Sequence, residues 1–143
     1  MIIRFILPVI VLYLFSCGGK EGSRNIELLS SRDSLLDVPV IEFIVDSHDF
    51  GKISEGEKIS FTFPYTNSGK GGLIINSASA SCGCTVPSYS KEPLLPGEKG
   101  KIEILFDSNG RLGVQHKTIA IRTNGSPGIK ILDIYAEVIE NNK

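Results

Sequence analysis

The chain has 143 residues, of which 22% are charged and 41% are hydrophobic, and it contains 3 cysteines and no tryptophan. A chain of this length accommodates one domain of ordinary size and a tail. Its 15 basic and 16 acidic residues nearly cancel, which argues against binding to nucleic acid and against a polybasic contact with a membrane surface.

Residues 1–16 predict a lipoprotein signal peptide. Arg4 supplies a short positive region, and Phe5 to Phe15 form an almost purely apolar run. This run is shorter than the ~20 residues that a transmembrane helix needs, and it lies where a secretory signal lies. It ends in Leu14-Phe15-Ser16-Cys17, which is typical of a lipobox, whereas an ordinary signal peptide ends in an Ala-x-Ala-like site. We therefore expect cleavage after Ser16 and lipidation of Cys17.

Residues 17–39 are predicted to be a lipidated N-terminus and a flexible tether. Small and polar residues follow Cys17, and residues 26–37 mix leucines with serines and charged groups. A flexible segment of about 22 residues has a root-mean-square reach of roughly 25 Å. The resemblance of the leader to those of bacterial lipoproteins implies several acyl chains on Cys17, palmitate among them, which hold a protein firmly on a membrane.

These features predict a location in the bacterial cell envelope. Gly18 follows the lipidated residue, at the position where many lipoproteins retained at the inner membrane carry an aspartate. By that sorting rule, which comes from resemblance to other lipoproteins, we expect attachment to the outer membrane, on its periplasmic or its surface face.

From Val40 onward, hydrophobic residues recur at every second position, which is typical of β-strands with one buried face. Clusters of glycine, proline, asparagine and serine separate these runs and predict turns. Pro64 lies inside the first run and indicates a sheet edge or a bulge, because proline cannot donate a hydrogen bond to a neighbouring strand. The alternating runs are 59–65, 102–106, 119–121 and 132–138.

Several short strands separated by turns indicate a single all-β domain over residues 40–143, an immunoglobulin-like β-sandwich. The tryptophan and the widely spaced cysteine pair of antibody domains are missing from the sequence. Glycines are expected to shape its turns. Gly51 and Gly56 are expected to bend the chain on either side of the strand that opens the domain, and 67–72 to form a wide hairpin loop with positive φ. In Leu95-Pro96-Gly97-Glu98, proline and glycine occupy the second and third positions of a predicted turn.

Short motifs spread over this domain carry a family resemblance. They include Asp49-Phe50-Gly51-Lys52-Ile53, Thr66-Asn67-Ser68-Gly69, Ser81-Cys82-Gly83-Cys84-Thr85 and Phe106-Asp107-Ser108. Together they resemble the bacterial family known as domain of unknown function 1573, from about Val45 to Val138. The resemblance implies a small exported protein, often a lipoprotein, with an immunoglobulin-like domain of the Hydin type. It implies a fold and a location, but no activity.

Cys82 and Cys84 are the only cysteines left once Cys17 is assigned to lipid, and thiols of exported proteins tend to pair. In an extended strand their Cβ atoms would lie too far apart for a disulfide, but Gly83 allows backbone angles that bring the sulfurs together. Three states compete. They are a strained, easily reduced Cys82–Cys84 disulfide, a reduced pair that holds a soft ion such as Cu(I), and two thiols buried as small hydrophobic groups.

A zinc site is disfavoured, because two cysteines need two further ligands. The chain offers only His48 and His116 as good candidates, and neither lies at metal-ligand spacing from the other or from the cysteines. We expect both histidines at the surface. Cys82, Cys84 and His116 form the one set that the fold could still bring together.

The sequence shows no catalytic signature: no Gly-x-Ser-x-Gly, no phosphate-binding glycine loop and no His-Glu-x-x-His. We therefore expect a non-enzymatic module without a cofactor, attached to a membrane through lipid. It would bind a protein or an envelope polymer through its edge strands and the loops that carry Cys82 to Tyr89. The alternative is an envelope thiol-redox or Cu(I)-binding protein that uses Cys82 and Cys84.

Overall fold

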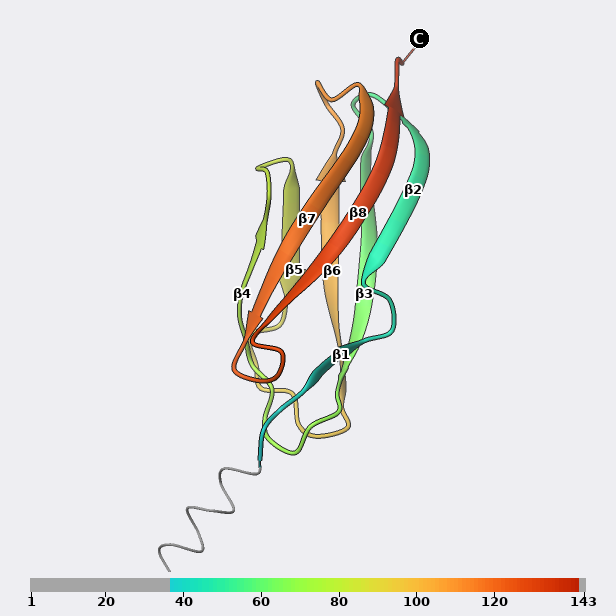
Figure 1. The fold of residues 1–143 in the computed structure, drawn as a ribbon. Helices are drawn as coiled ribbons and strands as arrows, with labels where there is room; N and C mark the ends of the chain where they lie inside the picture. Colours follow the sequence, from blue (N-terminus) through green and yellow to red (C-terminus); the bar gives the residue numbers. More distant parts are fainter. Residues whose placement is uncertain (1–36, 142–143) are drawn as a thin grey trace, which may run out of the picture.

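The computed structural model describes residues 37–141, which form eight β-strands and no helix (Figure 1). The prediction of an all-β domain is confirmed. The expected signal peptide and the lipidated Cys17 lie outside the described residues. Within them, no helix is long and apolar enough to cross a membrane. The strands are β1 (Ile41–Phe43), β2 (Ser47–Ser54), β3 (Lys58–Asn67), β4 (Ile75–Ala80), β5 (Thr85–Tyr89), β6 (Lys99–Asp107), β7 (Gly113–Thr123) and β8 (Ile129–Ile139).

The strands form two sheets that pack face to face as an immunoglobulin-like β-sandwich. One sheet has the strand order β1-β3-β6-β5, and the other has the order β2-β8-β7-β4. Strands β2 and β8 run parallel, whereas the other neighbours are antiparallel. Each sheet therefore has two edge strands, and the connection from β4 to β5 carries the chain from one sheet to the other.

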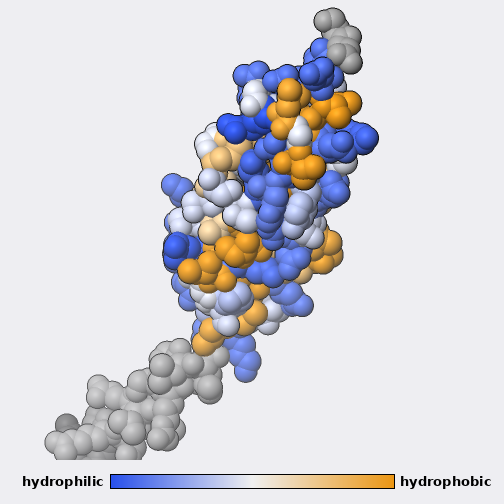
Figure 2. Space-filling view, turned by 45° about the horizontal axis from the view of Figure 1, so that its top comes forward, coloured by the Kyte–Doolittle hydropathy of each residue, from blue (hydrophilic) through white to orange (hydrophobic). Residues whose placement is uncertain are grey.

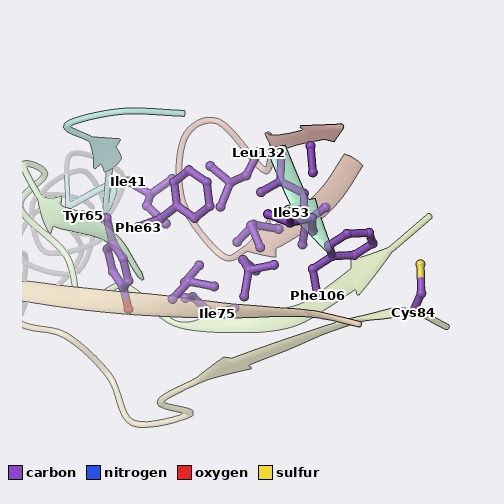
Figure 3. Packing of buried hydrophobic residues seen from close by; sticks show 14 of the residues in the cluster. Ile41, Ile53, Phe63, Tyr65, Ile75, Cys84, Phe106 and Leu132 are labelled. Carbon is purple, nitrogen blue, oxygen red and sulfur yellow. The ribbon is translucent and has the colours of Figure 1, made fainter. Parts of the chain in front are cut away.

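The core lies between the sheets and consists of the residues that the sequence alternation places on the inner faces. The side chains of Phe63, Ile104, Ile121 and Leu132 are completely buried. Figure 3 shows side chains of both sheets packed against one another, with Cys84 at one end of the cluster. Burial of such side chains contributes about 1.5–3 kcal/mol each relative to exposure, so this core is the main stabilising element of the fold.

Pro64 lies on β3 where the pairing with its neighbour β1 ends. Strand β1 pairs with β3 only from Tyr65 to Asn67, and the backbone N–H of Ile44 donates to the carbonyl oxygen of Pro64 at 3.4 Å. The backbone nitrogen and carbonyl of one strand residue face the same neighbour, so the nitrogen of Pro64 faces the side that β1 leaves open. The proline therefore removes no hydrogen bond between strands, as the expected edge position requires.

The segment before β1 is clamped between two loops. Pro39 is buried, its carbonyl oxygen accepts from the N–H of Ser126 at 2.9 Å, and the carbonyl oxygen of Val38 accepts from the N–H of Lys70 at 3.2 Å. A Cβ atom on Gly69 or Gly125 would clash with the backbone of this segment. The structure thus joins residues 37–39, which the sequence analysis assigned to the tether, to the folded domain.

The turn glycines divide into two groups with different roles. Gly51, in a bulge of β2, and Gly56, between β2 and β3, have positive φ, and so does Gly97 in the turn closed by a hydrogen bond from Glu98 N–H to the Leu95 carbonyl oxygen at 3.0 Å. The expectation of positive φ for the 67–72 loop is wrong. Its glycines do not have positive φ, and Gly69 is needed instead because the backbone of the 37–40 segment passes against it.

Different connections between strands lie at the two ends of the sandwich. Figure 1 shows the described chain beginning at Asp37 at the lower end, together with the β3–β4 and β7–β8 connections. The β2–β3, β4–β5 and β6–β7 connections and the end of β8 lie toward the opposite, upper end. We call these the proximal and the distal end, respectively.

Candidate functional site

A disulfide joins Cys82 to Cys84 in the connection between β4 and β5. The two Cα atoms are 5.3 Å apart, within the range of ordinary disulfides. The bond therefore lies at the distal end, where the chain crosses from one sheet to the other. Gly83 between the two cysteines is exposed, has no positive φ and has open space where a Cβ atom would lie.

Backbone hydrogen bonds hold this connection from both sheets. The Ser81 N–H donates to the Thr118 carbonyl oxygen at 2.9 Å, and the Ser81 hydroxyl accepts from the Thr118 N–H at 3.2 Å. On the other side, the Asp107 N–H donates to the Cys84 carbonyl oxygen at 2.9 Å. The positions of the two cysteines are thus set by the sheets that flank them as well as by the bond between their sulfurs.

The two sulfurs have different surroundings. Cys84 belongs to the hydrophobic core and is only 7% exposed, whereas Cys82 is half-buried and packs against the margin of that core. The hydroxyl oxygen of Thr85 lies 3.7 Å from the Cys82 sulfur and 3.8 Å from the Cys84 sulfur. An incoming reagent therefore reaches Cys82 more easily than Cys84.

A shallow cavity of about 240 Å³ lies beside the disulfide, lined by Gly83, Cys84, Asp107, Asn109 and Arg111. The Nε atom of Arg111 is buried, and no described residue supplies it with a hydrogen-bond partner. The pKa of Asp107 is lowered, chiefly by the hydrogen bond from the Asn109 backbone N–H and also by Lys58, whose Nζ lies 3.1 Å from the carboxylate. Arg111 adds to this lowering through its charge. The cavity beside Cys84 thus contains both a carboxylate and a guanidinium.

The structure places the histidines outside this site. His48 stacks on Phe61, with ring centroids 3.6 Å apart. His116 stacks on Tyr135, and its Nε2 lies 2.7 Å from a carboxylate oxygen of Asp133. In residues 37–141 the structure gathers no group of three metal-ligating side chains, so His116 does not join the two cysteines.

A second candidate surface lies on the outer face of the β2-β8-β7-β4 sheet at its distal end. We call it the distal patch and define it as the exposed residues Val114, Tyr135 and Ile139 of the sheet, together with Leu112, which is exposed in the loop that leads into β7. Val114 pairs with Glu137 on β8, and Tyr135 and Ile139 flank Glu137 on the same face. Figure 2 shows hydrophobic residues gathered near the end of the molecule where β8 ends.

Val114 and Tyr135 also line a groove of about 390 Å³ next to the bulge of β2, together with Gly51 and Lys52. The sequence analysis missed this surface and Arg111, and it placed the expected contact surface at the edge strands and in loops carrying Cys82 to Tyr89. The structure shows that Thr85–Tyr89 is strand β5 and not a loop. The signal for the patch was present, because hydrophobic residues occupy outward positions of 129–139, but alternation alone does not show which sheet end they share.

Solved structures that resemble the domain share its fold at low identity. A protein of unknown function from Porphyromonas gingivalis W83 superposes with a TM-score of 0.63 at 19% identity, over 71% of this chain and 48% of that chain. A PapD-like domain of human CEP192 gives 0.60 at 14% identity, over 74% and 89%. The VesB protease of Vibrio cholerae gives 0.53 at 18% identity, over 75% and 34%. These likenesses show the fold alone.

This chain spans about half the length of the Porphyromonas gingivalis protein and a third of the protease, so it corresponds to one module of each. No curated protein matches its sequence. The family model described as "Protein of unknown function (DUF1573)" matches residues 41–138, from the first residue of β1 almost to the end of β8. The chain therefore belongs to the DUF1573 family.

Proposed function

We propose that the chain is a lipid-anchored, non-enzymatic binding module of the bacterial cell envelope, attached through acyl chains on Cys17 to the outer membrane. In this proposal, residues 17–36 form the tether, and the immunoglobulin-like domain binds a protein partner. The lipobox sequence supports the anchor, and the DUF1573 membership and fold support a binding module. The family's own description assigns no activity.

The observation that carries the proposal is the separation of the two ends of the sandwich. The described chain enters at Asp37 at the proximal end, while the distal patch lies at the other end of the same sheets. A tether attached at Asp37 would therefore leave the distal patch directed away from the membrane. Isolated exposed hydrophobic residues are ordinary, but several on one sheet face are typical of a contact surface.

The chemistry of the distal patch favours a protein partner over an envelope polymer. Val114 is 82% exposed, and the charged neighbours Lys52 and Glu137 neutralise each other in an ion pair of 3.7 Å. Asp49 lines the same groove as Val114, so the charged residues of that groove sum to a negative charge. The surface thus offers apolar contact and one aromatic ring, without a net positive charge for a polyanionic polymer. Apolar and aromatic groups surrounded by polar residues are the usual composition of protein interfaces.

Photo-crosslinking in living cells tests this proposal. A photoreactive phenylalanine analogue replaces Val114 in one variant and Leu95 in a matched control, since Leu95 is also an exposed hydrophobic residue but lies in a proximal turn. We expect a discrete crosslinked protein from position 114 and none from position 95. A probe at Ile139 should give the same product, and V114D in that chain should abolish it.

Equal crosslinking from both positions, or a product at 139 that survives V114D, would contradict the proposed surface. A polydisperse ladder of products would contradict the choice of a protein partner, since it indicates a polymer. The fold of each variant is checked by its circular dichroism spectrum, so that loss of crosslinking is not confused with unfolding.

A further inference from the structure

The Cys82–Cys84 disulfide is placed where it contributes little to the stability of the fold. It closes a loop with one intervening residue, so it removes little conformational entropy from the unfolded chain. The same connection is held by the hydrogen bonds of Ser81 with Thr118 and of Cys84 with Asp107. The sulfur–sulfur bond can therefore open while the flanking strands keep their positions.

The two cysteines of the disulfide also differ in exposure. Cys82 is half-buried between the exposed residues Ser81 and Gly83, whereas Cys84 lies in the core. Thiol–disulfide exchange requires the incoming thiolate to approach one sulfur while the other departs. This asymmetry favours attack on Cys82 and departure of Cys84.

The residue that carries the departing sulfur shares a cavity with a cation. Arg111 and Cys84 line the same cavity, and the Arg111 Nε has no partner within the described part of the chain. A nearby guanidinium stabilises a thiolate and so makes it a better leaving group. Two carboxylates lie close to Arg111: Asp107, which is paired with Lys58 and lines the same cavity, and Glu55, which accepts a hydrogen bond from the Gly110 N–H at 3.1 Å. The paired carboxylate opposes the thiolate less than a free one would.

We propose that Cys82 and Cys84 form a thiol–disulfide exchange site for a dithiol protein, with Cys82 as the attacked sulfur, Cys84 as the leaving thiolate and Arg111 as the positioning residue. The partner's thiolate forms a bond to the Cys82 sulfur, and the electron pair of the Cys82–Cys84 bond departs on Cys84. The partner's second thiolate then attacks the mixed disulfide and releases Cys82. The domain gains two electrons and two protons, and the partner's dithiol becomes a disulfide.

This site is independent of the distal patch, and its first test locates the attacked sulfur. The oxidised protein is mixed with glutathione, quenched with iodoacetamide and mapped by mass spectrometry. We expect glutathione on Cys82 and the alkyl group on Cys84, in a protein whose circular dichroism spectrum is unchanged. Glutathione mainly on Cys84, no adduct at millimolar glutathione, or unfolding on reduction would each overturn the proposal.

The second test measures the redox equilibrium with glutathione in R111Q and in the matched control R122Q, which removes the same charge from an exposed residue at the proximal end of β7. R111Q should shift the equilibrium about threefold to tenfold toward the disulfide, because the reduced form loses its stabilising cation. R111K should keep the equilibrium close to that of the original chain, because lysine retains the positive charge. R122Q should not change the equilibrium. An unchanged equilibrium in R111Q, or an equal shift in R122Q, would remove Arg111 from the site.

Discussion

Asn67 is the side chain that joins the loops of the proximal end. It is completely buried at the last position of β3. Its Oδ1 accepts hydrogen bonds from the backbone N–H groups of Val40 and Gly69, and its Nδ2 donates to the carbonyl oxygens of Gly71 and Leu94. One asparagine therefore satisfies four backbone groups in three segments that share no sheet ladder at these positions.

Replacement of Asn67 by alanine should destabilise the domain by about 3 kcal/mol, because four half-buried backbone groups would lose their hydrogen-bond partner at once. Denaturant unfolding of the purified chain without its first 17 residues gives the free energy of unfolding. N76A is the matched control, since Asn76 is exposed on β4, and we expect a change below about 0.5 kcal/mol. Equal effects of the two substitutions would show that the Asn67 network is not a stabilising element.

At the scale of whole strands, the hydrophobic alternation predicted the inner strands well. Strands β3, β6, β7 and β8 contain the four alternating runs, and their inward positions form most of the core. These strands could be predicted because each has its own buried face. No alternating run marks β1, β2, β4 or β5, although a strand was expected between Gly51 and Gly56, where β2 ends.

The four strands without an alternating run are the four sheet edges, and their sequences explain why they lack one. Strand β2 buries only Ile53, and β4 consists largely of serine and alanine. Strand β5 contains Pro87, and a proline inside a segment argues against predicting that segment as a strand. Such segments become strands through pairing with a distant neighbour, and local sequence does not contain that information.

Glycines show a second limit of local sequence. The sequence reveals where glycines occur, but it does not reveal whether a site uses their freedom of φ or their lack of a side chain. Gly51, Gly56 and Gly97 use the first property, and Gly69 and Gly125 use the second. The second role depends on residues 37–40 passing between two loops, which is a feature of the tertiary structure.

Replacement of Gly125 by alanine should release this clamped segment. The new Cβ atom would collide with the Pro39 backbone and weaken the bonds from Ser126 N–H to Pro39 and from Ile41 N–H to Ser126. We expect hydrogen exchange at Ile41 to accelerate at least about tenfold while exchange in β6 stays unchanged.

The matched control for this measurement is G128A. Gly128 has no positive φ, and a Cβ atom there would meet only an ordinary contact at 3.8 Å. Exchange at Ile41 should therefore remain close to that of the original chain. Faster exchange throughout the domain in G125A would instead indicate global destabilisation and would argue against a local clamp.

For the whole molecule, the proposed role depends on the chain entering the domain at the proximal end while the disulfide and the distal patch lie at the other end. The local sequence suggests the leader and the lipidation of Cys17, and both stay predictions. It also singles out Cys82 and Cys84, but it leaves a disulfide, a Cu(I) site and two buried thiols open. Arg111 and the distal patch could not be predicted. Arg111 shares a cavity with Cys84, and Val114 pairs with β8, only in the folded domain. The sequence thus identifies the cysteines of the Cys82–Cys84 site, and the structure identifies the residues around them.

The proposed membrane location depends on acyl chains attached to Cys17. They can be detected by mass spectrometry of the N-terminal peptide, from protein recovered from the membranes of the cells that make it. We expect a peptide that begins at Cys17 and carries the added mass of acyl chains, palmitate included, and a C17A chain that is absent from the membrane fraction. A peptide that begins at Met1, or one that begins at Cys17 without any acyl mass, would contradict it.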